Sequence, residues 1–298
     1  MLLQRLDAYE RLIRLDKPIG TLLLLWPTLT ALFLAQAQMA EPGEPWYPPL
    51  PILWVFILGT LLMRSAGCAF NDFADRHIDG HVSRTFNRPL PAGEIMPWEA
   101  VAVAVILALS ALALIWTMPS AVKEWALYSV LVAAVYPFSK RFLRMPQGIL
   151  GIAFSMGIPM AYAAQMHVVN HAALVLMAIN WLWVIAYDTE YAMCDREDDN
   201  KLAIGTSAKL FGRFDVAAVM GCYAAYLLAM GGWGYGHQRG AFYYLGLVVA
   251  AGIALYHFHL IKDRDPSKCF KAFLHNHWLG LAVLAGVVVD NYFLLRAV

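Results

Sequence analysis

Residues 50–79 read LPILWVFILGTLLMRSAGCAFNDFADRHID, an apolar stretch that ends in regularly spaced polar residues. Its apolar part, Leu50 to Phe70, has about the 20 residues that an α-helix needs to cross ~30 Å of hydrocarbon. The polar part follows at once, as Asn71, Asp72, Asp75 and Asp79. The stretch therefore predicts a membrane-spanning helix with carboxylates at one end.

The composition of the whole chain supports this interpretation. Of 298 residues, 60% are hydrophobic and 14% are charged, and the mean hydropathy is +0.56, which is too apolar for a soluble domain of this length. We predict an all-α polytopic membrane protein, a single domain of residues 1–298 with nine membrane-spanning helices. Their approximate ranges are Ile19–Gln38, Leu50–Phe70, Trp98–Met118, Trp125–Phe138, Gly148–Met166, Ala172–Tyr187, Phe214–Tyr235, Phe242–Ile261 and Trp278–Leu295.

Lysine and arginine indicate the orientation of these helices. With the N-terminus in the cytoplasm, 18 of the 22 Lys and Arg lie inside, and only Lys123, Arg239 and Arg296 lie outside. An excess of this kind is typical of the cytoplasmic face. It places residues 71–97 and 188–213 in the cytoplasm, where the basic residues would meet anionic lipid head groups. Nucleic acid is not indicated.

The first 17 residues combine seven charges with leucine and isoleucine in an amphipathic pattern. Such a segment is expected to lie on the membrane surface. The apolar run after it is too long for a signal peptide and has no small-residue cleavage site. Residues 1–17 therefore predict a surface helix that is followed by a retained first span.

A second acidic group follows the sixth predicted span, with Asp188 and the run Asp195-Arg-Glu-Asp-Asp199. Ten of the 21 Asp and Glu in the chain fall between positions 72 and 94 or between 188 and 199. The alternative is a solvated loop surface, where acidic runs are common. Two acidic groups at the ends of two membrane spans favour a binding site instead.

Helical geometry predicts how each acidic group is presented. If both helices continue past their spans at ~100° per residue, the first group shares one face within about 60°, namely Asp72, Asp75 and Asp79. The second shares a face within about 80°, formed by Asp188, Tyr191, Asp195 and Asp199, with Asp198 at its edge. Two helix ends would thus each offer an acidic face.

Carboxylates without His or Cys suit a hard cation, and Mg²⁺ is usually held by one or two carboxylates, water and substrate phosphate. Like charges at this spacing repel unless they are neutralised. The two acidic faces therefore predict a Mg²⁺-bound diphosphate between them. Its remaining charge would be neutralised by nearby basic residues, namely Arg84, Arg88, Lys140, Arg141 and Lys201.

A diphosphate held at the membrane surface indicates a substrate with a long apolar tail, such as a prenyl diphosphate. The two acidic patterns also resemble the signatures of the UbiA superfamily of intramembrane aromatic prenyltransferases. The signature N-D-x-x-D-x-x-x-D is present as Asn71, Asp72, Asp75 and Asp79, and D-x-x-x-D as Asp195 and Asp199.

Further strings look like the 4-hydroxybenzoate polyprenyltransferase branch of this superfamily, and they cover most of the chain. They are Arg14-Leu-Asp-Lys-Pro-Ile-Gly20, the Leu-Trp-Pro-Thr run ending at Thr28, Arg84-Thr85, Arg88-Pro-Leu90 and Tyr136-Pro-Phe-Ser-Lys-Arg141. The resemblance implies a nine-helix bundle with a central cavity open to the cytoplasmic side, in a bacterial inner membrane. It also implies Mg²⁺, a polyprenyl diphosphate donor and 4-hydroxybenzoate as acceptor, in ubiquinone biosynthesis.

The resemblance assigns roles to the acidic residues. Asp72, Asp75 and Asp79 are expected on one side of the metal, and Asp195 and Asp199 on the other. Stabilisation of the departing diphosphate would be the main catalytic effect. The ring carbon ortho to the hydroxyl would then attack the allylic cation. Asn71 would orient the metal or the diphosphate, although it could simply be a polar residue at a helix end.

Two arginines are candidates for the carboxylate of the aromatic acid. Arg64 is a charge within a span, which usually faces a cavity or a partner; balancing the acidic face is an equal alternative for it. Arg141 is the second candidate, with a plain cytoplasmic anchor as its alternative. Tyr187 and Tyr191 could stabilise the cation with their ring faces, or lie at the interface as tyrosines often do.

Two other functions fit part of the pattern. A UbiA-type enzyme with a haem vinyl group or a naphthoate as acceptor would share the acidic signatures. An ion-coupled transporter would also carry acids within the membrane. Transporter sites lie near the bilayer midplane, however, whereas both acidic groups here are predicted at helix ends on one side.

Overall fold

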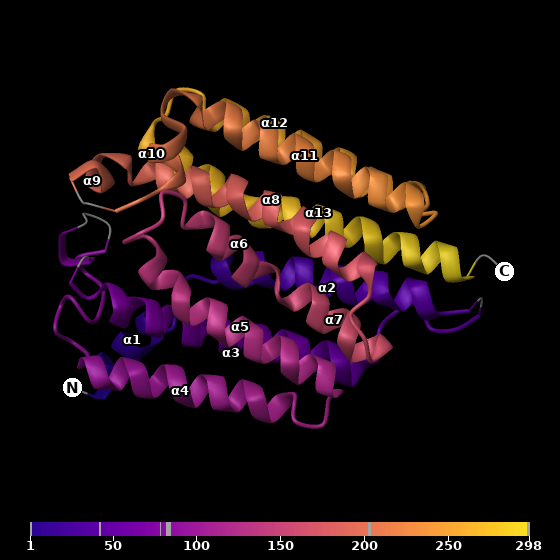
Figure 1. Ribbon diagram of the computed structural model, residues 1–298, viewed down its shortest axis with the longest axis horizontal. Helices are drawn as coiled ribbons and strands as arrows, with labels where there is room; N and C mark the ends of the chain where they lie inside the picture. The colour runs from indigo at the N-terminus through magenta and orange to yellow at the C-terminus, as the bar shows by residue number, and fades with distance from the viewer. Residues whose placement is uncertain (1, 42, 78, 82–84, 202–203, 297–298) are drawn as a thin grey trace.

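The computed structural model describes residues 2–41, 43–77, 79–81, 85–201 and 204–296. Every regular element in these ranges is a helix, so the all-α prediction is confirmed. The long helices run side by side along one direction (Figure 1). Eight of the described helical segments are long and apolar enough to cross a membrane. The chain is therefore an integral membrane protein.

The elements follow one another with short connections. Their bounds are α1 Leu2–Leu12, α2 Ile19–Met39, α3 Leu50–Asp75, η1 Asp79–His81, α4 Pro97–Leu114, α5 Ser120–Ser139, α6 Gln147–Ser155, α7 Gly157–Met166, α8 His171–Cys194, α9 Arg196–Lys201, α10 Ser207–Phe211, η2 Gly212–Phe214, α11 Asp215–Gly236, α12 Ala241–Ile261 and α13 Pro266–Arg296.

Prolines mark the points where many of these helices begin. A proline lacks the N–H that the first helical residues leave unpaired, so it is well tolerated there. Pro97 and Pro266 are the first residues of α4 and α13. The residue directly before α2, α3, α5 and α6 is also a proline, namely Pro18, Pro49, Pro119 and Pro146.

The fourth predicted span does not meet the same criterion. It corresponds to α5, which has 20 residues but is absent from the eight segments of sufficient length and hydropathy. The charges of Lys123 and Glu124 lower its mean hydropathy, as do the polar atoms of Trp125, Tyr128 and Tyr136. The fifth predicted span is divided at Met156 into α6 and α7.

Buried contacts join the helices into one bundle. The helix α13 packs against α12, α2 and α8, and α8 also packs against α11 and α6. The helices α3 and α4 form a second packed pair beside them. Large apolar side chains are exposed on the outer helices, for example Ile106, Leu131, Leu228 and Val248, where they would face lipid.

Both acidic segments lie at the same end of the bundle. The C-terminal ends of α3 and α8, together with α9, lie at the left in Figure 1, at the end that also carries α1 and the N-terminus. The helices α3 and α8 extend to Asp75 and Cys194. Residues 71–75 and 188–194, which begin the two segments predicted in the cytoplasm, are therefore helical, as expected if both helices continue past their apolar stretches.

The α12–α13 contact gives a test of the packing. A Cβ atom added to Gly246 would lie 2.8 Å from the carbonyl oxygen of Ala282 and 2.9 Å from the Cα of Gly286. Gly246→Ala should therefore reduce stability by about 1–3 kcal/mol, seen as a lower Tm in detergent. Gly252 of the same helix has nothing within 4 Å of such a Cβ, so Gly252→Ala is the matched control. Equal Tm values for the two variants would contradict this packing.

Candidate active site

Two carboxylates of the first acidic segment, Asp72 and Asp75, lie in the last turn of α3. Asp72 and Asp75 are both buried, and Asp79 is buried as well. Asp79 does not share their helix, because α3 ends at Asp75 and Asp79 begins the separate helix η1. The prediction that all three carboxylates share one helical face is therefore wrong for Asp79. A different interaction brings it to the other two.

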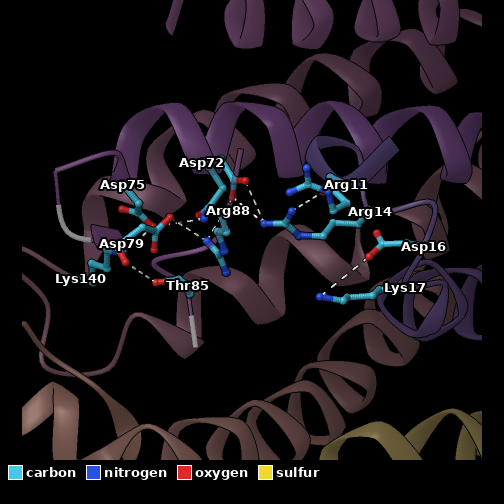
Figure 2. Close-up of polar contacts among 11 residues, drawn as sticks. Arg11, Arg14, Asp16, Lys17, Asp72, Asp75, Asp79, Thr85, Arg88 and Lys140 are labelled. Carbon is cyan, nitrogen blue, oxygen red and sulfur yellow. Dashed lines mark hydrogen bonds and ion pairs between the residues drawn. The ribbon is translucent and has the colours of Figure 1, made fainter. Parts of the chain in front are cut away.

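Arg88 makes that connection. Its Nη1 lies 3.1 Å from Oδ1 of Asp72 and 2.8 Å from Oδ2 of Asp79 (Figure 2). Thr85 supports the same loop, since its hydroxyl donates to the backbone oxygen of Asp79 at 2.7 Å. Arg84, another predicted site residue, lies outside the described residues. The loop after η1 thus folds back so that one guanidinium joins two acids from different elements.

Arg14 is a second cation on Asp72, and sequence reasoning did not select it. Its Nη2 lies 2.8 Å and 2.9 Å from the two carboxylate oxygens of Asp72. The backbone of Arg14 has a φ of 59°, which turns the chain between α1 and α2. The signal was available, since Arg14 opens the string to Gly20 that carries the family resemblance.

Asp75 has a different set of partners. Nζ of Lys140, at the end of α5, lies 2.5 Å from Oδ2 of Asp75. The side-chain amide of Asn71 donates to the same oxygen at 3.2 Å. The other oxygen, Oδ1, is buried and has no hydrogen-bond partner. A buried carboxylate oxygen without a partner is costly, so this atom is suited to receive a ligand.

Arg141 follows Lys140 but points elsewhere. It is exposed, its Nη2 donates to the backbone oxygen of Ala74 at 2.8 Å, and its guanidinium lies 5.2 Å from the ring centre of Phe138. Arg141 therefore ties the end of α5 to the end of α3. In this structure it does not contact the carboxylates.

The second acidic segment joins α8 to α9. Asp195 is the residue between the two helices, and Asp199 on α9 is buried. Nζ of Lys209 donates to the backbone oxygen of Asp199 at 3.0 Å. Asp198 pairs with Lys201 at 3.1 Å, and Lys201 is exposed.

Asp215 anchors this segment from outside the predicted site. It is fully buried and forms ion pairs with Arg196, the residue after Asp195, and with Arg264, the latter at 2.8 Å. The hydrogen bond to Asp215 raises the pKa of Arg264 above its ordinary value. Asp215 thus ties the start of α9 to the start of α11 and to the connection between α12 and α13.

Tyr136 of α5 is close enough to both acidic segments to interact with them electrostatically. It interacts electrostatically with Asp75 of α3 and with Asp188 and Tyr191 of α8. Sequence reasoning did not select this tyrosine, although it opens the string that ends at Arg141. The ends of α3 and α8 therefore face a common region beside α5.

Arg64 also belongs to this region. It interacts electrostatically with Tyr136 and Tyr187, its guanidinium lies 5.7 Å from the ring centre of Phe154, and its Nε is buried without a hydrogen-bond partner. A Cβ added to Gly20 of α2 would lie only 2.4 Å from its Nη2. No carboxylate within the described ranges forms an ion pair with Arg64.

Aromatic rings surround the remaining side of the region. Tyr187 is buried, lies 5.4 Å from Trp183 and 6.2 Å from Phe273 between ring centres, and has an unpaired hydroxyl. Tyr191 lies 4.6 Å from Phe273. A narrow cavity lies deeper in the bundle, lined mainly by apolar residues that include Leu34, Leu176, Trp183, Tyr226 and Val283.

The carboxylates described above suit a hard divalent cation whose coordination shell is completed by other ligands. Among the described residues, no three His, Cys, Asp or Glu side chains are placed to hold a metal ion by themselves. Mg²⁺ commonly uses one or two carboxylates and takes the rest of its ligands from water and phosphate. The unpaired Oδ1 of Asp75 and the neighbouring carboxylates match that chemistry.

Comparison with known proteins identifies the class. Residues 24–280 match the model of the UbiA prenyltransferase family, and the chain belongs to this family. Among curated relatives, the 4-hydroxybenzoate octaprenyltransferase of Nitrosospira multiformis is 53% identical over 296 residues, which cover 99% of each chain. That of Cupriavidus pinatubonensis is 54% identical over 286 residues, covering 96% of this chain and 98% of the relative.

Solved structures agree on the fold. An apo UbiA homolog from Aeropyrum pernix superposes with a TM-score of 0.77 at 21% identity, covering 91% of this chain and 97% of that one. A UbiA homolog from Archaeoglobus fulgidus bound to GPP and Mg²⁺ has a TM-score of 0.68 at 16% identity, covering 93% and 99%.

Arg88 offers a test of this arrangement. Arg88→Gln would leave Asp72 with Arg14 alone and would remove the ion pair of Asp79. Loss of a partner from buried acids should reduce stability by about 2–3 kcal/mol, measured as a lower Tm in detergent. Arg213→Gln is the control, because Arg213 lies over Phe214 and has no carboxylate partner in the described ranges. A Tm unchanged in both variants would show that Arg88 does not hold the loop.

Proposed function

We propose that this protein transfers a polyprenyl group from polyprenyl diphosphate to 4-hydroxybenzoate in ubiquinone biosynthesis. The new bond forms at the ring carbon ortho to the hydroxyl. The observation that carries this function is the identity of more than half of the residues with 4-hydroxybenzoate octaprenyltransferases over nearly the whole of both chains. The fold alone would not give the acceptor, because a digeranylgeranylglyceryl phosphate synthase shares it at 16% identity.

The proposed membrane arrangement is a single domain with nine spans. They are the eight segments of sufficient hydropathy and, in addition, α5, the fourth span along the chain. Its 20 residues are enough to cross the hydrocarbon region. The end that carries α1 and both acidic segments faces the cytoplasm of a bacterium, at the inner membrane, and the substrate cavity opens there. The positive-inside distribution supports this orientation. Exposed Leu3 and Leu6 support a position of α1 on the membrane surface.

The donor diphosphate is proposed to lie between the two acidic segments with Mg²⁺. Asp72, Asp75 and Asp79 would hold metal on one side, and Asp195 and Asp199 on the other. Bound Mg²⁺ would supply positive charge that stabilises the leaving diphosphate. Two structures of a UbiA homolog from Archaeoglobus fulgidus, one bound to GPP and Mg²⁺ and one to DMAPP and Mg²⁺, support this expectation.

Basic residues of the chain have a second role in this proposal. Arg14, Arg88 and Lys140 neutralise the buried carboxylates of the first segment. With the carboxylates holding Mg²⁺, these side chains would be available to the phosphate oxygens, together with Arg84 and Lys201. Asn71 would turn its amide from Asp75 to the same ligands, and Asp198 would keep Lys201 near the second segment.

The carboxylate of the aromatic acid is proposed to bind Arg64. Its guanidinium is partly buried beside Gly20 and Phe154 and has no acidic partner in the part of the chain described here. Arg141 remains the alternative, but it is exposed and donates to a backbone oxygen. An unpaired arginine within the membrane is costly, so an anionic ligand would stabilise Arg64 more.

The ring chemistry follows from this placement. With its carboxylate on Arg64, the acceptor would present its ring toward the donor near Tyr136, Tyr187 and Tyr191. The faces of Tyr187 and Tyr191 would stabilise positive charge on the allylic carbon as the carbon–oxygen bond breaks. The new carbon–carbon bond then forms, and loss of the ring proton restores aromaticity.

The alternative of an ion-coupled transporter receives no support. Both acidic segments lie at one end of the bundle (Figure 1), whereas transporter sites lie near the midplane. An acceptor such as haem or a naphthoate would keep the fold and both signatures. The curated relatives favour 4-hydroxybenzoate over these.

Removal of one carboxylate on either side tests the donor site. Asp75→Asn and Asp195→Asn should each lower kcat by at least about a hundredfold, because each removes negative charge that binds metal. Prenylation of 4-hydroxybenzoate by purified protein with excess Mg²⁺ is the measurement. Asp263→Asn, at an exposed acid between α12 and α13, should leave kcat unchanged. Full activity in both site variants would end the proposed metal roles.

Substitution of the two arginines separates the acceptor candidates. Arg64→Ala should raise the KM for 4-hydroxybenzoate by about 10–100-fold, the value of one charged hydrogen bond, and leave the KM for the donor near its original value. Arg141→Ala should change the acceptor KM little. A large rise in the acceptor KM for Arg141→Ala and little change for Arg64→Ala would instead assign the carboxylate of 4-hydroxybenzoate to Arg141.

A further inference from the structure

A second polar group lies behind the proposed active site, centred on Glu190 of α8. Its carboxyl group is completely buried, and α8 is one of the membrane-length helices. Glu190 precedes Tyr191 by one residue, but at ~100° per residue it faces a different side. Its contacts come from α11, α12 and α13. Ionisable groups in such a position are expensive and commonly functional.

Each oxygen of the Glu190 carboxyl has a partner. Oε1 lies 2.9 Å from the hydroxyl oxygen of Tyr223, and Oε2 accepts from Nδ2 of Asn276 at 2.7 Å. Nδ1 of His257 is 3.6 Å from Oε1. All three neighbours are buried. Solvent therefore does not supply the hydrogen bonds of this group.

The orientation of the Asn276 amide is fixed by a group that can only donate. Nε1 of Trp183 lies 3.0 Å from Oδ1 of Asn276, and an indole N–H cannot accept. The Asn276 atom that faces Trp183 is therefore the amide oxygen, Oδ1. The amide nitrogen faces the carboxyl of Glu190 and the backbone oxygen of Ala272, at 2.7 Å and 3.1 Å.

The Tyr223 hydroxyl then has more acceptors than protons. Its oxygen lies 2.9 Å from Oε1 of Glu190 and also 2.9 Å from Oδ1 of Asn276. A tyrosine hydroxyl donates one proton. If that proton goes to Asn276, the short contact with Glu190 needs a proton from the carboxyl group. If that proton goes to an ionised Glu190 instead, the Tyr223 oxygen and Oδ1 of Asn276 face each other at 2.9 Å with no proton between them.

The two histidines fit the first assignment, in which Nδ2 of Asn276, 3.5 Å from Nδ1 of His257, gives its two protons to Glu190 and Ala272. Nδ1–H of His257 can donate to the Tyr223 oxygen at 3.1 Å, and Nε2 of His257 then accepts from Nδ1–H of His275 at 3.1 Å. The hydroxyl of Tyr223, the amide of Asn276 and both oxygens of Glu190 then have partners, and both imidazoles are neutral. The thiol of Cys269 on α13 also interacts electrostatically with Glu190.

Among the described residues, the helices around Glu190 place no compensating cation against it. The facing groups are Tyr223 from α11, His257 from α12, and Asn276 and Cys269 from α13. Within the described part of the chain, neither Lys nor Arg forms an ion pair with it. An ionised carboxylate without a cation in such a place would be strongly destabilising.

We propose that Glu190 is held as a neutral carboxylic acid that donates to Tyr223, and that this buried group positions the active-site end of α8. Within three residues of Glu190, the same helix carries Tyr187, Asp188 and Tyr191, which face the region shared with Tyr136. Glu190 binds this part of α8 to α11 and α13. The positioning role depends on the proposed function, but the protonation state does not.

Infrared difference spectra of purified protein in detergent at neutral pH test the protonation state. The wild type minus Glu190→Gln should show a carbonyl stretch of a protonated carboxylic acid that shifts in D₂O. A carboxylate band in its place would overturn the proposal, whatever the enzymatic activity. Glu190→Gln should fold, because an amide N–H can donate to Tyr223 as the acid does, and a variant that fails to fold would also contradict it.

The pH dependence of stability is a second readout. Glu190 is protonated in the folded protein and ionised in the unfolded chain at neutral pH, so the wild type should lose stability as pH rises. The Tm of Glu190→Gln should exceed that of the wild type by an amount that grows between about pH 6 and pH 9. A Tm difference that stays constant with pH would contradict a protonated Glu190 in the folded protein.

The positioning role has its own measurement. Glu190→Gln should keep kcat/KM within about threefold, and Tyr223→Phe should lower it by roughly tenfold, because it leaves an oxygen of Glu190 without a partner. Activity retained in Glu190→Gln distinguishes a positioning role of Glu190 from a role as a catalytic acid, because glutamine keeps the hydrogen bonds but cannot transfer a proton. An inactive Glu190→Gln that folds normally would contradict the role, and equal activity of all three proteins would do so too.

Discussion

The structure depends on how buried carboxylates at the end of a membrane helix are neutralised. Asp72 and Asp75 lie at the end of α3, where an uncompensated charge would be strongly destabilising. Arg14, Arg88 and Lys140 supply the positive charge from three other segments. The ion pairs therefore determine where the N-terminal segment, the loop after η1 and the end of α5 must lie.

The same principle organises the second half of the bundle. Asp215 holds Arg196 and Arg264 at the start of α9 and before α13. Glu190, which has no Lys or Arg partner in the described part of the chain, is satisfied by hydrogen bonds with Tyr223 and Asn276 instead. In the proposed function, an arrangement that neutralises acids with side chains when no ligand is bound would exchange those side chains for metal and diphosphate. Such an exchange would connect the fold with a reaction whose leaving group is an anion.

The sequence predicted most helices, because apolar length is a local property of the chain. It did not show that α3 ends at Asp75, and so it misplaced Asp79, which is brought back by Arg88 across nine residues. Arg14 and Tyr136 were missed as site residues for the same reason. Their contacts join segments far apart in the chain, and no spacing rule reports such contacts. The comparisons confirmed the family, while the individual site residues remain proposals.

The central claim is that the acidic ends of α3 and α8 act on one diphosphate. A double-mutant cycle tests it, using Asp75→Asn, Asp195→Asn and both together, with the Kd of the donor diphosphate measured in Mg²⁺. Two residues that share a ligand should show a coupling free energy above about 1 kcal/mol. Effects that add within about 0.5 kcal/mol would mean that the two segments bind independently, and that would contradict the account.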